Sequence, residues 1–218
     1  MQPPELAHWH APLAALAHAA ADNDGAHDGS HLDRVWRHAQ ALLTHHPEAD
    51  ALVVMAACYL HDLVNLPKNH PDRAQASRRS ALLAREQLAR CGFPPAKLDA
   101  VAHAIEAHSF SAAITPTTIE AKIVQDADRL DALGAIGLAR MFYIAGSMGR
   151  ALAHPGDPLA LERPLDDRAF TLDHIAVKLA QLPGMMQLDA GRALAEARLA
   201  RLLAFRAEFA AEWLGDAA

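Results

Sequence analysis

The chain has few of the residues that mark several protein classes. It contains 2 cysteines, Cys58 and Cys91, which form no CxxC pair and lie inside apolar helical patterns. This usage argues against a disulfide framework and indicates two buried free thiols in a reducing, cytoplasmic setting. Aromatic residues make up only 5% of the chain, and the formal net charge is −6. Because nucleic-acid-binding surfaces carry a basic excess, we expect no nucleic-acid partner.

Long apolar runs and strand patterns are also missing. No stretch of about 18 apolar residues occurs, so we expect no transmembrane helix and no membrane partner. The N-terminus has no basic n-region, and a signal peptide is not expected. No segment shows the alternation and β-branched enrichment of a strand, and no internal repeat or low-complexity linker stands out. With 52% hydrophobic residues, the sequence predicts an all-α protein with a real core.

Apolar periodicity and helix-breaking residues place the helices along the chain. The expected helices span about 5–21, 30–46, 48–61, 72–91, 94–107, 117–133, 135–147, 171–182 and 187–214. We expect Ser30, Asp72 and Thr171 to act as N-caps, with Thr117 or Thr118 beginning another helix. The sequence therefore predicts a single helical-bundle domain over 1–218. Its site-bearing core occupies about 27–140, and a C-terminal helical extension occupies about 171–214.

Four acidic or imidazole groups stand at predicted helix ends or beside loops: His31, the adjacent pair His61 and Asp62, and Asp128. Two imidazoles and two carboxylates supply the nitrogen and oxygen ligands that a divalent ion needs for hydrolysis. This donor set suits one Mn²⁺, Fe²⁺, Co²⁺, Ni²⁺ or Mg²⁺ better than a structural zinc. Neighbouring residues diverge by about 100° within a helix, so the pair can converge only where the helix ends.

Each of these residues also has a simpler interpretation. His61 fits the C-terminal end of a helix, where the macrodipole favours a basic group. However, a polar pair at the end of a strongly apolar helix would be costly to bury unless it is hydrogen-bonded or binds a metal. Asp126, Asp128 and Asp131 all interrupt one apolar pattern, so Asp126 and Asp131 stay alternatives for the last ligand.

Several longer segments match a known family. They are HDGSHLDRVW at 27–36, ACYLHDLVNLPKNHPDRAQAS at 57–77, IEAHSFS at 105–111, EAKIVQDADRLDALGAIGLAR at 120–140 and PLDDRAFTLDHIAVKL at 164–179. On these segments the chain resembles the HD-domain phosphohydrolases, in particular the compact stand-alone bacterial proteins of about this length. The resemblance implies an all-helical core with one divalent metal bound by His31, His61, Asp62 and Asp128.

The resemblance also implies hydrolysis of a phosphate ester or anhydride, commonly in a nucleotide. Asp62 would then be both a ligand and a proton acceptor for the attacking water. His108 would protonate the leaving group or bind phosphate, although it also fits a helix C-terminal residue. Developing negative charge needs cationic or polar partners near the metal. The candidates for substrate binding are His27, Arg34, Lys68, Asn69, Arg73 and Ser77.

One position departs from some HD enzymes. Those that hydrolyse guanosine tetraphosphate carry an acidic pair shortly after the HD motif, where this chain has Asn65 and Leu66. That activity is therefore not expected. No GYP-type motif is present, which disfavours cyclic-di-GMP hydrolysis.

Alternative functions remain open from the sequence. An HD scaffold can sense a nucleotide without turning it over, and some HD-fold proteins use two irons and O₂. A second iron would need more histidines, such as His27, His103 or His108. The chain could also be an Ala-rich oligomerisation protein, and as an enzyme it could be a monomer or a homodimer. No base-stacking aromatic stands out, because Phe93, Phe110, Phe142 and Tyr143 fit the core equally well.

Overall fold

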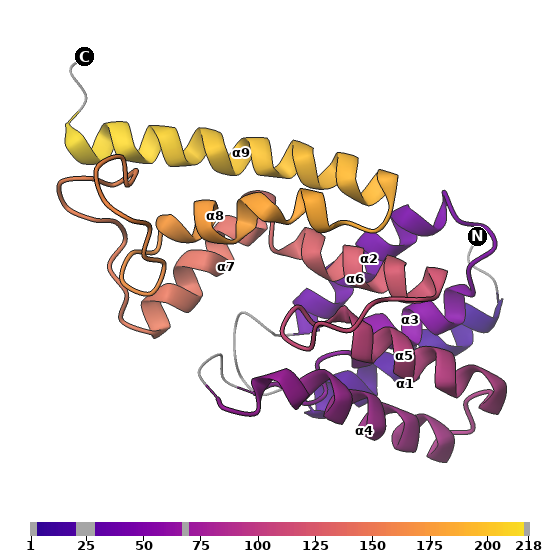
Figure 1. Ribbon diagram of the computed structural model, residues 1–218. Helices are drawn as coiled ribbons and strands as arrows, with labels where there is room; N and C mark the ends of the chain where they lie inside the picture. The colour runs from indigo at the N-terminus through magenta and orange to yellow at the C-terminus, as the bar shows by residue number, and fades with distance from the viewer. Residues whose placement is uncertain (1–3, 21–28, 67–69, 216–218) are drawn as a thin grey trace. The chain divides into compact units, whose positions relative to one another are not determined.

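The computed structural model describes residues 4–20, 29–66 and 70–215. The described residues form helices and connecting turns without a strand, which confirms the all-α prediction. The α-helices are α1 (Pro4–Ala20), α2 (Gly29–Leu43), α3 (Ala51–Leu60), α4 (Ala76–Arg90), α5 (Leu98–His108), α6 (Ile119–Asp131), α7 (Gly134–Ser147), α8 (Asp173–Val177) and α9 (Asp189–Leu214). Four short 3₁₀ turns join them, at Arg73–Gln75, Pro95–Lys97, Leu179–Gln181 and Pro183–Met185. Figure 1 shows their course along the chain.

The chain forms two compact units, residues 1–128 and residues 129–218. The first unit contains α1 to α5 and most of α6, and the second contains α7 to α9. The single domain over 1–218 stays a prediction. No helix among the described residues is both long enough and apolar enough to cross a bilayer.

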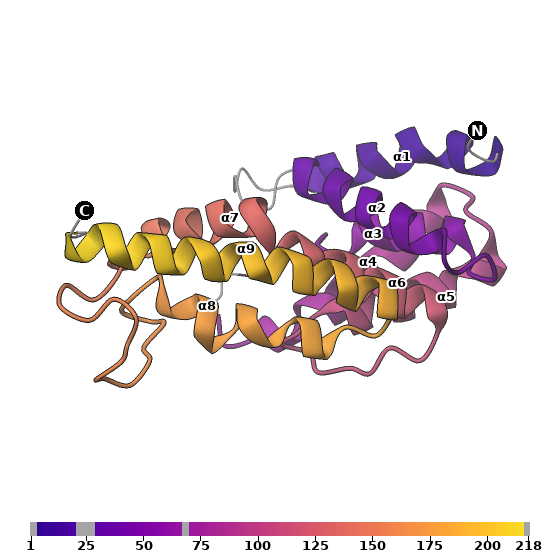
Figure 2. The same ribbon diagram turned by 90° about the horizontal axis from the view of Figure 1, so that it is seen from above.

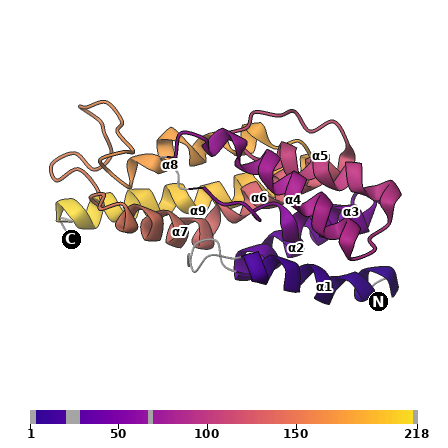
Figure 3. The same cartoon turned by 90° about the horizontal axis from the view of Figure 1, so that it is seen from below.

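Helix α3 is the centre of the first unit. Every residue from Leu52 to Leu60 is buried. The helix packs against α1, α2 and α5, while α4 lies along α5 (Figure 3). A helix that is apolar all round is stable only when neighbours cover it on every side. This burial explains the unbroken run of apolar residues before the HD motif.

Local signals set the ends of the helices beside the motif. Asp50 caps α3, because its carboxylate accepts hydrogen bonds from the amides of Leu52 (3.0 Å) and Val53 (3.3 Å). The helix therefore starts at Ala51 rather than at residue 48. Helix α4 ends at Arg90 with Cys91 as its C-cap, one residue before the predicted end, and Gly92 follows with a φ of +76° that glycine adopts easily.

Three predicted caps were wrong. Ser30 lies inside the first turn of α2, where its hydroxyl accepts a hydrogen bond from Arg34 at 2.8 Å. Asp72 precedes a 3₁₀ turn and makes no capping bond there; it pairs with Arg79 at 3.0 Å instead. The Thr171 hydroxyl donates to the carbonyl of Ala151 at 2.8 Å. In each case the side chain bonds to a group other than the backbone amides of the first helical turn, so it does not act as an N-cap.

Two other expectations had mixed outcomes. Thr118, one of the two proposed start residues, caps α6 by accepting from the amide of Ala121 at 3.2 Å. Cys58 is buried as expected, but Cys91 is exposed, which corrects the prediction of two buried thiols. Cys91 is exposed because it follows the last turn of α4, outside the apolar stripe of that helix.

The second unit is built around α9, which runs along α7 and contacts α8 (Figure 2). Phe142 of α7 packs against Phe205 and Phe209 of α9. The loop before α8 is held by Asp173, a fully buried carboxylate that accepts two hydrogen bonds from Arg163, at 2.6 and 2.9 Å. This second unit contributes no residue to the cluster described next.

Candidate metal centre

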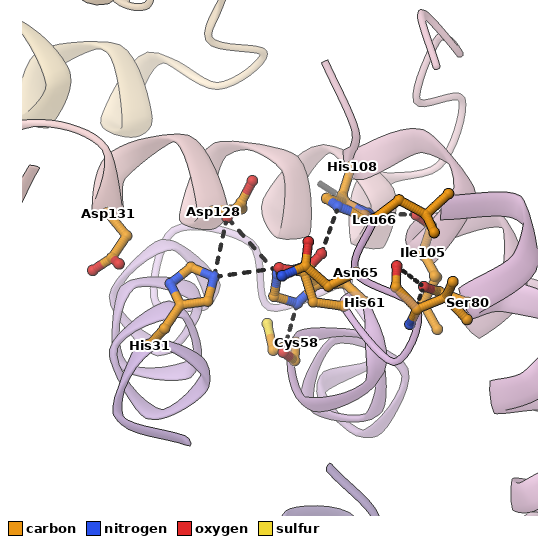
Figure 4. Close-up of polar contacts among 12 residues, drawn as sticks. His31, Cys58, His61, Asn65, Leu66, Ser80, Ile105, His108, Asp128 and Asp131 are labelled. Carbon is orange, nitrogen blue, oxygen red and sulfur yellow. Dashed lines mark hydrogen bonds and ion pairs between the residues drawn. The ribbon is translucent and has the colours of Figure 1, made fainter. Parts of the chain in front are cut away.

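Four segments bring five polar side chains together in the first unit, and Figure 4 labels four of them, His31, His61, His108 and Asp128. His31 stands in the first turn of α2, and His61 and Asp62 directly follow α3. Asp128 lies near the end of α6, and His108 is the last residue of α5. Each is at or near a helix end, where side chains from helices running in different directions can meet.

The ligand atoms of these residues form one cluster. The Nε2 atom of His31 lies 3.5 Å from Asp128 Oδ1 and 4.0 Å from Asp62 Oδ2. The Nε2 atom of His61 lies 3.8 Å and 3.6 Å from the same two oxygens. On the other side of Asp62, Oδ1 lies 3.8 Å from His108 Nε2. Within the described residues, these are the only groups of three or more that could hold a metal ion.

Hydrogen bonds at Nδ1 define the tautomers of two of the histidines. His61 Nδ1 lies 2.9 Å from the carbonyl of Cys58, and His108 Nδ1 lies 2.6 Å from the carbonyl of Ile105. A carbonyl oxygen can only accept, so both Nδ1 atoms carry the proton. Each Nε2 atom of a neutral ring then presents a lone pair to the cluster, as a metal ligand does.

The Nε2 atom of His61 provides the test of fit. It is buried and has no hydrogen-bond partner among the described residues, although carboxylate oxygens surround it. A lone pair that faces carboxylate oxygens in a buried site is unfavourable unless a cation lies between them. The donor set of imidazole nitrogen and carboxylate oxygen fits a divalent ion of the Mn²⁺ to Ni²⁺ series.

The cluster also shifts the pKa values of its members. Burial raises the pKa of Asp128, but the nearby His61, His31 and His108 outweigh it and hold that pKa below its usual range. Burial and His61 lower the pKa of His108, against the opposite effect of Asp62. The lowered pKa of Asp128 favours its ionised carboxylate, and the lowered pKa of His108 favours its neutral imidazole.

Hydrogen bonds to backbone carbonyls fix α6 against its neighbours. The Nδ1–H of His38, two turns after His31 on α2, donates to the carbonyl of Ala127 at 3.2 Å. The amide of Gln125 donates to the carbonyl of Ala107 at 2.7 Å, next to His108. These bonds tie the turn of α6 that precedes Asp128 to α2 and to α5, and so set the position of Asp128 relative to the histidines. Neither His38 nor Gln125 was identified from the sequence, because their partners lie far away along the chain.

The two alternative aspartates are buried outside the cluster. Asp131 accepts a hydrogen bond from Arg140, and Asp126 is fully buried. Asp126 is two residues from Asp128, which places it about 200° away around the helix axis. The geometry therefore favours Asp128 over both.

The candidate substrate-binding residues are in different situations. The guanidinium of Arg73 donates to Asn65 Oδ1 at 2.8 Å and to the carbonyl of Leu66, so it braces the loop after the HD motif. Arg34 donates to Ser30. The hydroxyl of Ser77 is buried and has no hydrogen-bond partner in the part of the chain described. His27, Lys68 and Asn69 lie outside the described residues.

Two buried serines one turn apart on α4 make a matched pair. Ser80 Oγ accepts from the amide of Val64 at 3.0 Å and so holds the loop after Asp62, whereas Ser77 Oγ has no such partner. We expect Ser80→Ala to lower the free energy of unfolding by about 1–2 kcal/mol, because the Val64 amide is left unsatisfied. We expect Ser77→Ala to change it by less than about 0.5 kcal/mol. Urea denaturation measures both free energies. Equal losses of stability in the two variants would show that Ser80 does not stabilise the loop after Asp62.

Comparisons with known proteins identify the family. The sequence pattern of the HD domain matches residues 29–133. The uncharacterized protein YpgQ of Bacillus subtilis (strain 168) is 36% identical over 188 residues, which cover 84% of this chain and 83% of YpgQ. The chain belongs to the HD-domain family. The five clustered residues lie within the matched HD domain, and the resemblance inferred from the sequence is confirmed.

Solved structures extend the match to nearly the whole HD protein. The crystal structure of B. subtilis YpgQ in complex with ADP aligns with a TM-score of 0.72 at 31% identity, covering 94% of this chain and 98% of that chain. An HD-superfamily hydrolase from Bacillus thuringiensis aligns with a TM-score of 0.71 at 26% identity, covering 96% and 99%. The chain is thus related over nearly all of its length to stand-alone bacterial members of the HD superfamily of hydrolases.

Proposed function

We propose that this HD protein is a metal-dependent phosphohydrolase or pyrophosphohydrolase. Its substrate would be a nucleotide or a similar small phosphorylated metabolite, cleaved at a phosphate ester or anhydride bond. The observation that carries the proposal is the buried lone pair of His61 Nε2, which faces Asp62 and Asp128 and has no hydrogen-bond partner there. The complex of B. subtilis YpgQ with ADP supports a nucleotide as the ligand class.

In this proposal His31, His61, Asp62 and Asp128 hold one divalent ion. A divalent ion at such a site supplies Lewis acidity toward a phosphoryl oxygen and lowers the pKa of water. The protein contributes the ionised carboxylate of Asp128 and neutral imidazole rings. The ring of His61 is oriented by its hydrogen bond to the carbonyl of Cys58. The identity of the ion follows from supply and selectivity in the cell as well as from these ligands.

Proton transfer is assigned to Asp62 and His108. Asp62 Oδ1 and His108 Nε2 lie 3.8 Å apart, on the side of Asp62 away from His31. Both atoms are acceptors in the tautomer fixed by Ile105, so either can take a proton from an attacking water. Asp62→Asn tests the assignment: a variant that keeps its metal and full activity would place the base elsewhere.

Binding of the negatively charged part of the substrate is assigned to residues around the HD motif. Arg34, Arg73, Lys68 and Asn69 supply donors to phosphate oxygens, with Ser77 and His27 as further contacts. Arg73 uses part of its guanidinium for the loop brace, so its contribution is both to position the loop and to add positive charge. The single domain over 1–218, the core at 27–140, the cytoplasmic location and a monomeric or homodimeric state belong to the same proposal.

The deciding experiment combines elemental analysis with a product assay. Gently purified protein is expected to hold about one transition metal per chain. Nucleoside mono-, di- and triphosphates would be incubated with Mn²⁺, Mg²⁺, Co²⁺ or Ni²⁺, with separate detection of phosphate and pyrophosphate. Metal-dependent release of one of them supports the proposal and identifies the bond.

Three results would contradict it. Micromolar nucleotide binding without turnover under any metal would indicate a sensor. Two irons per chain with visible absorbance would indicate oxygen chemistry. Absence of metal even after reconstitution would leave an all-helical binding or oligomerisation protein.

Metal removal is expected to lower thermal stability. An ion that binds only the folded protein at about 100 times its Kd contributes about 2.7 kcal/mol. For a chain of this length that corresponds to a Tm shift of about 5–10 °C. Differential scanning fluorimetry with and without a chelator measures the shift, and Asp128→Ala should show none. A shift of the same size in Asp128→Ala would place the metal elsewhere.

A further inference from the structure

The structure separates the four aromatic residues that the sequence left equivalent. Phe93 is buried, with 1% of its surface exposed, and Phe142 packs on Phe205 and Phe209. Tyr143 is 54% exposed but lies on α7 in the second unit. Phe110 is 51% exposed and lies in the first unit, in the loop that follows α5. Of these four aromatic residues, Phe110 is therefore the one that is half exposed and also belongs to the first unit.

Chain connectivity places the backbone of Phe110 close to that of His108, a member of the cluster. His108 ends α5, and Ser109 is extended, with φ −72° and ψ 127°. Two residues of extended chain span at most about 7 Å, so the backbone of Phe110 lies within that distance of His108. His108 Nε2 is in turn 3.8 Å from Asp62. A ligand that extends from the cluster past His108, as a nucleotide can, is therefore able to reach Phe110.

The loop that carries Phe110 is held at both ends. The backbone amide of Thr117 donates to His103 Nε2 at 3.0 Å, which ties the far end of the loop to α5. Gln125 holds the near end through the carbonyl of Ala107. Between them, Ala113 has a φ of +52°, a left-handed conformation that is rare for alanine. Such strained residues cluster at ligand-binding sites, where the fold holds a defined loop shape.

Charge differs between the two segments that flank the cluster. From Ser109 to Ile119 the sequence has no charged residue; the first is Glu120. The segment after the HD motif has Lys68, Asp72 and Arg73, of which the structure describes Asp72 and Arg73, and Asp72 is paired with Arg79. A ligand with an anionic end and a flat, uncharged end matches this division.

We propose that Phe110 is the stacking platform for the base of the bound nucleotide. The inference rests on the proposed function for its ligand class and deepens it by naming the residue that contacts the base. Stacking on one aromatic face discriminates little between bases, so purines and pyrimidines both bind, with purines favoured by their larger ring area. Phe110 thereby contributes to affinity for nucleotides over base-free phosphates.

Calorimetric titration with two probes tests this role. ADP carries a base, and inorganic pyrophosphate lacks one; both are titrated into the full-length protein in the same Mn²⁺ buffer. The variants are Phe110→Ala, Phe110→Tyr and, as a control, Tyr143→Ala, which removes an equally exposed aromatic from the second unit. We expect Phe110→Ala to weaken ADP binding about 5- to 150-fold and to leave pyrophosphate binding unchanged. We expect Phe110→Tyr and Tyr143→Ala to match the unmodified protein.

Several results would overturn the platform. ADP binding within twofold of the unmodified protein in Phe110→Ala would do so, as would a parallel loss of both probes, which indicates loop damage. Equal affinity of the unmodified protein for the two probes, or no binding of either, would also do so. Turnover is measured separately, so a protein that binds ADP without hydrolysing it would contradict the proposed reaction while the affinities still decide the role of Phe110.

Discussion

An Asp128→Ala variant is expected to lose the bound metal and at least about 10³-fold in hydrolytic rate. Asp128 Oδ1 lies between the Nε2 atoms of His31 and His61, at 3.5 and 3.8 Å, so one carboxylate closes the centre between two helices. Removing it leaves the imidazoles without the anionic oxygen that a divalent ion requires. Loss of an ion that stabilises transition-state charge by several kcal/mol corresponds to about 10³-fold in rate.

Asp99→Ala is the matched control for this variant. Asp99 is also a helical aspartate of the first unit, but its side chain is 80% exposed and pairs with the exposed Arg85. It should retain metal content and activity. Elemental analysis and initial rates measure both, and circular dichroism checks that each variant folds. Full metal occupancy in folded Asp128→Ala would show that Asp126 or another carboxylate is the ligand.

Asp173→Ala is expected to lower the free energy of unfolding of the protein by about 3–5 kcal/mol. The fully buried Asp173 accepts two hydrogen bonds from Arg163 and one, at 2.8 Å, from the amide of Asp166. Removing one partner of a buried ion pair leaves the other charge uncompensated, which costs far more than an exposed pair contributes. The pair also holds the loop before α8, because Arg163 bonds to the carbonyl of Asp157.

Asp167→Ala provides the comparison. Asp167 pairs with His174 at 2.7 Å, but its side chain is partly exposed, so its loss should cost about 1 kcal/mol or less. Denaturant unfolding measures the free energies, and limited proteolysis reports whether residues 151–170 are released in Asp173→Ala. Equal stability of the two variants would show that the buried pair contributes no more than an exposed one.

The helices were predictable because local sequence determines them. The apolar run from Leu52 to Leu60 and the breaking residues Pro47 and Gly92 set element boundaries to within a few residues. The caps were predicted less well, because Ser30, Asp72 and Thr171 each bond to a partner that competes with the cap. Capping depends on backbone angles and on nearby donors, and both depend on how the chain packs.

By itself, the sequence determined the helical fold class and the candidates His31, His61, Asp62 and Asp128, because residue type, helix ends and motif order are local properties. Only the tertiary structure decided which atoms meet. It brought His108 to Asp62, left Asp126 and Asp131 outside the cluster, and exposed Phe110 while burying Phe93. The bond from His38 to Ala127 joins residues 89 positions apart. Such contacts depend on the packing of whole helices, which no local pattern encodes.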